Sequence, residues 1–142
     1  MTTAPQRLST FIVEDSAIIL ENLVATLEEL APVQVVGSAG DEATAVQWLL
    51  QGGGTRCSLM IIDVYLRAGS GLGVLRSAAA AGVLAQRVVL TNYATPDMRE
   101  KCVALGAHRV FDKSDELDEL IAYCAQLARG SPAPASTTGE AT

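Results

Sequence analysis

The chain has 142 residues, the size of one ordinary domain, and 49% of them are hydrophobic, which is enough to build a core. A charged fraction of 18% argues against a disordered chain, and a net charge of −6 argues against direct nucleic-acid binding, which usually needs a basic face. No apolar stretch is as long as a membrane helix, and acidic residues break the first apolar run, so we expect no signal peptide, no membrane insertion and a cytoplasmic location.

Short apolar runs alternate with helix-like stretches along the chain. We expect strands over 8–13, 33–39, 59–63, 87–91 and 109–113. We expect helices over 16–30, 41–50, 72–81, 95–105 and from about 115 to 128. Asp41 is a good N-cap for the second helix, and Ser114 or Asp115 is expected to cap the last one. In the first helix, several apolar side chains recur near helical spacing, namely Ile18, Ile19, Leu23, Leu27 and Leu30.

The alternation of five strands and five helices with short connections predicts a three-layer α/β sandwich. We therefore expect residues 8–129 to form one domain and residues 1–7 to be a flexible N-terminus. Residues 130–142 consist mainly of Pro, Ala, Ser, Thr and Gly, which predicts a disordered tail.

Charged or hydroxyl side chains stand at the ends of four of the apolar runs. The first run leads into Glu14 and Asp15, the third into Asp63, the fourth into Thr91 and the fifth into Lys113. Sites of parallel sheets lie just beyond the carboxyl ends of the strands, so we expect these groups to converge, with Asp63 exposed at the tip of its strand. Carboxylates that share a pocket repel one another, which a hard cation such as Mg2+ relieves, and Lys113 could pair with one of them or with an incoming anion.

In their order and spacing these motifs resemble the receiver domains of two-component response regulators, the CheY-like family. The resemblance covers residues 8 to about 128 and includes the acidic pair, the Leu-Met-Ile-Ile-Asp strand, Gly71, Thr91 and the Gly106-Ala107 pair that leads to Lys113. It implies a flavodoxin-like three-layer sandwich: a doubly wound five-stranded parallel sheet of order 2-1-3-4-5 flanked by five helices.

The resemblance also implies roles for single residues. Asp63 would be the phosphoacceptor that attacks a phosphohistidine and becomes an aspartyl phosphate. Asp15 and Asp63 would ligate Mg2+ together with the backbone carbonyl of Tyr65, and Glu14 would act directly or through water. Lys113 would contact the phosphoryl oxygens. The Thr91 hydroxyl would swing to the phosphoryl group and report its presence.

The chain departs from the usual family pattern at several positions. Arg67 stands where a proline is usual, and Val110 stands where a switch aromatic is usual. The neighbouring Phe111 is interpreted as a core residue, because lone aromatic residues in strands usually pack. Asn92 follows Thr91 at a position that is usually small, and Ser114 replaces a usual proline.

The implied function is that of a single-domain response regulator of a two-component or phosphorelay system, not a turnover enzyme. Its partners would be a sensor histidine kinase or phosphotransfer protein and a separate downstream effector protein. Three alternatives remain: a phosphorylation-independent interaction module, a receiver cut from a longer DNA-binding regulator, and an aspartate-nucleophile phosphatase resembling the haloacid dehalogenases. The last alternative expects an acid two residues after the nucleophile, where this chain has Tyr65.

Overall fold

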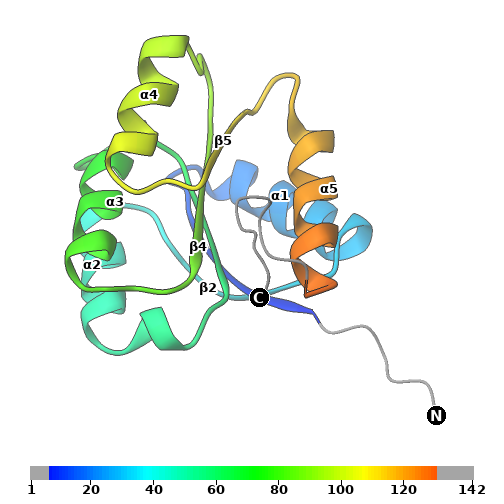
Figure 1. Cartoon of the computed structure of the whole chain (residues 1–142), viewed down its shortest axis with the longest axis horizontal. Helices are drawn as coiled ribbons and strands as arrows, with labels where there is room; N and C mark the ends of the chain where they lie inside the picture. The colour runs from blue at the N-terminus through cyan, green and yellow to red at the C-terminus, as the bar shows by residue number, and fades with distance from the viewer. Residues whose placement is uncertain (1–6, 131–142) are drawn as a thin grey trace.

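The computed structural model describes residues 7–130 and shows a central sheet covered by helices on both faces (Figure 1). The strands are β1 (Leu8–Val13), β2 (Val33–Ala39), β3 (Leu59–Ile62), β4 (Gln86–Thr91) and β5 (Arg109–Asp112). The helices are α1 (Ala17–Leu30), α2 (Glu42–Leu50), α3 (Gly71–Ala80), α4 (Pro96–Ala104) and α5 (Leu117–Ala128), and a short 3-10 turn, η1, covers Gly53–Thr55.

The five strands run parallel in the order β2-β1-β3-β4-β5, which confirms the predicted doubly wound fold. The α1 and α5 helices cover one face, and α2, α3 and α4 cover the other (Figure 1). Each face has its own hydrophobic cluster, because alternate side chains of a strand point to opposite faces. Met60 and Ile62 of β3 therefore join the α2–α3–α4 cluster, whereas Leu59 and Ile61 join the α1–α5 cluster.

The centre of the sheet is the most deeply buried part of the structure. All four residues of β3 are buried, as are the last four residues of β1 and of β4. Strands buried on both faces read as continuous apolar runs, which is why these segments were recognisable in the sequence. The carboxyl ends of three neighbouring strands are thus held rigidly side by side.

The last helix starts later than expected, and neither Ser114 nor Asp115 caps it. Its N-cap is Glu116, whose side chain makes no capping hydrogen bond. Residues 113–115 form a turn instead, in which the Ser114 amide donates to the Asp112 carboxylate over 2.8 Å. The Asp112 side chain thus stabilises a turn at the position where the sequence suggested a helix start.

The apolar face of α1 is narrower than its sequence suggested. Leu23 and Leu27 are buried as expected, but Ile18 and Leu30 are 72% and 59% exposed. Only one stripe of a helix reaches the sheet on which it packs, so apolar residues outside that stripe stay in solvent. None of the helices within residues 7–130 has the length and apolar character that crossing a bilayer requires.

The two expected flexible ends lie mostly outside the described residues. Arg7 is described, and its guanidinium donates to the Val33 carbonyl over 2.7 Å, which fastens the start of β1 to β2. Gly130 is described as well and adopts a left-handed backbone with φ of 78°, which suits the end of α5.

Candidate functional site

The candidate site lies where β1, β3, β4 and β5 end. Asp63 directly follows β3, and its amide donates to the Val13 carbonyl over 3.0 Å, so the carboxylate is fixed between the ends of β1 and β4. Thr91 is the last residue of β4 and is paired with Asp112 of β5. Because the neighbouring strands are parallel, the side chains that follow them meet at this edge.

The Asp63 carboxylate is buried, which contradicts the expectation that it is exposed at the strand tip. Asp63 is only 6% exposed, because neighbouring groups cover both oxygens of its carboxylate. The Thr91 hydroxyl donates to Oδ1 over 2.8 Å, and the Tyr65 amide donates to the same oxygen over 3.2 Å. The Lys113 ammonium donates to Oδ2 over 2.8 Å. Asp63 is therefore a preorganised carboxylate surrounded by donors.

Lys113 joins two buried carboxylates. Its Nζ lies 2.6 Å from Glu14 Oε1 and 2.8 Å from Asp63 Oδ2. Burial alone would lower the pKa of Lys113, but the hydrogen bonds to Asp63 and Glu14 outweigh it and raise the pKa above its ordinary value. Two carboxylates and one ammonium leave this group with one negative charge in excess, so it attracts a further cation.

The two acids at the end of β1 have different surroundings. Glu14 is 4% exposed and is fully engaged, since its second oxygen accepts the Ser16 amide over 3.0 Å. The Asp15 carboxylate instead lies 4.0 Å from the guanidinium of the exposed Arg67. A cleft of about 290 Å³ opens beside it and is lined by Asp15, Gly40, Asp41, Arg67 and Ala68.

Four of the five predicted groups, Glu14, Asp63, Thr91 and Lys113, therefore form one hydrogen-bonded cluster, and the fifth, Asp15, is not part of it. Within residues 7–130, no three His, Cys, Asp or Glu side chains are grouped closely enough to hold a metal ion by themselves. Magnesium does not require such a cage, because it keeps several waters and commonly uses one or two carboxylates. Asp15, Asp63 and the Tyr65 carbonyl supply hard oxygen donors of that kind, so the donor set fits this ion.

The switch candidates of β5 differ in their packing. Phe111 is 2% exposed and packs beside Tyr123 with a ring-centroid distance of 5.9 Å, so it is a core residue as predicted. Val110 is half-buried against the cluster on the opposite face. These two residues therefore point into different layers of the sandwich.

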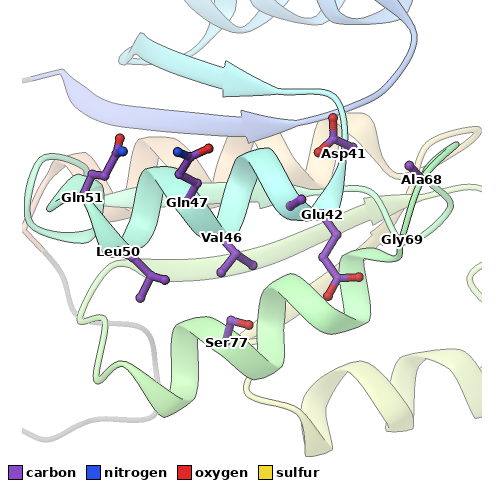
Figure 2. Close-up of a pocket in the computed structure, with 10 residues that line it drawn as sticks. Asp41, Glu42, Val46, Gln47, Leu50, Gln51, Ala68, Gly69 and Ser77 are labelled. Atoms are coloured by element: carbon purple, nitrogen blue, oxygen red, sulfur yellow. The ribbon is translucent and has the colours of Figure 1, made fainter.

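Glu42 supports the loop that follows Asp63, a role that was not predicted from the sequence. Its carboxylate extends from α2 to the N-terminal end of α3, where Oε1 accepts the Ser70 amide over 2.9 Å (Figure 2). Gly69 and Gly73 leave room for this side chain, because a Cβ on either glycine would collide with it. The Gly-Ser-Gly-Leu-Gly run thus admits a carboxylate that fixes the loop after Asp63. The glycines of this run were the only indication in the sequence that a close approach occurs here, and only the tertiary structure shows that the Glu42 side chain makes it.

Changing Gly73 to Ala should lower the free energy of unfolding by about 1 kcal/mol, measured as the urea midpoint. Displacing Glu42 forfeits a charge-assisted hydrogen bond, and the better helix propensity of alanine offsets part of that loss. In a Glu42→Ala background the same change should become stabilising by roughly 0.5 kcal/mol, because only the propensity term remains. An equal loss in both backgrounds would show that Glu42 does not determine the need for glycine.

A buried carboxylate at a parallel strand end, with a hydroxyl and an ammonium on its oxygens, is the arrangement that the resemblance to receiver domains predicts. The comparisons with known proteins agree, since a family model described as the response regulator receiver domain matches residues 10–125. The chain therefore belongs to the receiver domain family of two-component response regulators.

Individual relatives show how far the likeness extends. A Bacillus subtilis (strain 168) protein, the uncharacterized transcriptional regulatory protein YvfU, is 28% identical over 120 residues. That match covers 84% of this chain but only 58% of the relative, so the chain spans little more than half of that protein's length.

Two solved structures share the fold at low sequence identity. The response regulator domain of Thermotoga maritima CheB has a TM-score of 0.72 at 14% identity, covering 89% of this chain and 96% of that one. A DNA-binding response regulator of the LuxR family from Staphylococcus aureus has a TM-score of 0.74 at 16% identity, covering 85% of this chain and 98% of that one.

Proposed function

We propose that Asp63 accepts a phosphoryl group from the phosphohistidine of a sensor kinase or phosphotransfer protein. One carboxylate oxygen attacks the phosphorus, a P–O bond forms, the P–N bond breaks, and its electron pair stays on the imidazole nitrogen. The observation that carries the proposal is the buried Asp63 carboxylate with Thr91 and Lys113 on its two oxygens. After transfer these two donors are close enough to contact the phosphoryl oxygens.

Asp15 and Asp63, with the Tyr65 carbonyl, would hold a magnesium ion, which when bound supplies positive charge against the phosphoryl oxygens. Glu14 would contribute through water, because both of its oxygens already accept hydrogen bonds from Lys113 and Ser16. Lys113 neutralises part of the charge that builds up on transfer, and burial of the cluster strengthens that interaction.

The proposed output is regulated binding to a separate effector protein, without turnover of an external substrate. A net charge of −6 disfavours direct contact with nucleic acid. The family match favours this function over a haloacid-dehalogenase-like phosphatase, which would need a second acid where Tyr65 stands.

The proposed function is tested by the intact mass of the whole chain after incubation with acetyl phosphate. We expect a gain of one phosphoryl group with magnesium and none when the ion is removed by a chelator, with the label on the peptide that contains Asp63. A label on another peptide, or equal labelling without magnesium, would contradict the proposal.

The phosphoryl group should be lost slowly, because neither of the two side chains expected to flank the approach of water supplies a carboxylate or amide to orient it. The residues two positions beyond Asp63 and Thr91 are Tyr65 and Tyr93, which are 51% and 79% exposed. Replacing them by Asn and Glu should speed the decay of phosphoprotein by about tenfold, since positioning a nucleophile lowers its barrier. A Leu84→Asn, Val103→Glu variant, changed at two exposed apolar positions elsewhere, should decay at the parent rate. Equal decay in the tyrosine variant and the parent would rule out this role.

A further inference from the structure

A polar cluster outside the phosphoryl site links α4 to the turn that follows β5. Arg99 of α4 contacts three groups: its Nη2 donates to Glu116 Oε1 over 2.7 Å, its Nη1 to the Val110 carbonyl over 3.1 Å, and its Nε to the Ala94 carbonyl over 2.8 Å. One guanidinium thus ties together the β4–α4 loop, β5 and the start of α5. Nothing in the sequence reasoning singled out this arginine.

Asp112 and Glu116 reinforce the same link. The Ala94 amide donates to Asp112 Oδ2 over 3.1 Å, and the Asp112 amide donates to Glu116 Oε1 over 2.8 Å. Hydrogen bonds from the Ala94 and Ser114 amides lower the pKa of Asp112, and the hydrogen bond from Arg99 lowers the pKa of Glu116. Both acids therefore stay ionised at neutral pH and keep these contacts.

The loop held by this cluster begins immediately after Thr91. The Thr91 side chain is fully buried with its hydroxyl on Asp63, and its carbonyl accepts the Lys113 amide over 3.0 Å. Two residues later, Tyr93 adopts a left-handed backbone with φ of 58°, which a non-glycine residue adopts at an energetic cost. The Tyr93 side chain is 79% exposed and gives the loop little support. Within the loop the Thr95 amide donates to the Tyr93 carbonyl over 2.8 Å, and contacts from other elements at Ala94 hold residues 92–95 in place.

We infer that Arg99, braced by Glu116, is a positioning residue that holds the 92–95 loop so that the Thr91 hydroxyl faces Asp63. The inference rests on the proposed function of Asp63 as phosphoacceptor. Arg99 touches neither the carboxylate nor the incoming group, and it acts through the main chain of Ala94 and Val110. A loop fixed in advance does not have to be ordered when the phosphoryl group arrives, which favours binding of that group.

The test is the affinity of the full chain for a beryllium–fluoride complex, a tetrahedral mimic of the phosphoryl group, in the presence of magnesium. Arg99→Met removes all three donors and keeps an unbranched apolar stem, and we expect it to weaken binding by about fivefold. The pair is partly exposed, with side-chain exposures of 36% for Arg99 and 30% for Glu116, which limits the effect to that scale. Arg76→Met makes the same change at an exposed site on α3 and should bind like the parent.

A second comparison separates positioning of Thr91 from general stability. In a Thr91→Ala background, Arg99→Met should cause no further loss of affinity, because the hydroxyl that it positions is gone. If Arg99→Met does not fold, Glu116→Gln serves as the milder variant and should weaken binding in the same direction. Binding of the variant as tight as the parent's, or a fivefold loss that persists without the hydroxyl, overturns the inference. If the parent itself takes up neither the mimic nor a phosphoryl group, the proposed function fails, and the inference fails with it.

Discussion

Replacing Asp63 with Asn should abolish uptake of a phosphoryl group and leave the fold intact. The amide lacks the anionic oxygen that attacks phosphorus, so the mass gain with acetyl phosphate and magnesium should disappear. Stability should change by no more than about 1 kcal/mol, because the amide oxygen still accepts a hydrogen bond and Lys113 keeps the carboxylate of Glu14. The intact mass measures the loss of phosphoryl uptake, and the free energy of unfolding measures whether the fold is intact.

Asp118→Asn is the matched control, since it makes the same change at an exposed position on α5. It should gain one phosphoryl group like the parent. Full labelling of Asp63→Asn would move the acceptor to another residue, whereas an unfolded Asp63→Asn would show that the carboxylate holds the strand ends together.

The fold and the position of Asp63 at the end of a central strand were predictable from the sequence, because both depend on local pattern. A strand buried on both faces must be apolar along its length, so the polar residue that ends it stands out, as Asp63 does after β3. Parallel pairing then brings Thr91 and Lys113 to the same edge without any further information. The burial of Asp63 was not predictable, because it depends on how neighbouring donors cover the carboxylate.

The supporting contacts were not predictable for a related reason. Glu42 and Arg99 reach partners on other elements, at Ser70 and Glu116, and such reach depends on how helices are set against loops. In the sequence, Glu42 looks like an ordinary residue of a first helical turn, and Arg99 looks like an ordinary residue within a helix. The predicted start of α5 was wrong because the Asp112 side chain accepts the Ser114 amide. That hydrogen bond stabilises a turn where the sequence suggested a helix cap.

Lys113→Met should lower the free energy of unfolding by about 3 kcal/mol in magnesium-free buffer at neutral pH. Removing one partner of a buried ion pair leaves uncompensated charge, and here two carboxylates with side-chain exposures of 3% and 8% would face each other. Added magnesium should restore part of that loss, because a divalent cation can replace the missing positive charge. Magnesium should therefore stabilise the variant more than it stabilises the parent.

The alkaline pH dependence gives this prediction a second measurement. The folded pKa of Lys113 is raised above its ordinary value of 10.5, so its contribution to stability is complete below that value and disappears as the pH rises through the folded pKa. Lys113→Met should lack this component of the alkaline decline, whereas Lys101→Met, which changes the exposed lysine of α4, should keep it and unfold at the parent's urea midpoint. If the two variants had equal midpoints, or if magnesium stabilised the parent as much as Lys113→Met, Lys113 would not be the cation that balances Glu14 and Asp63. In that case the strand ends would be held together by their backbone pairing alone.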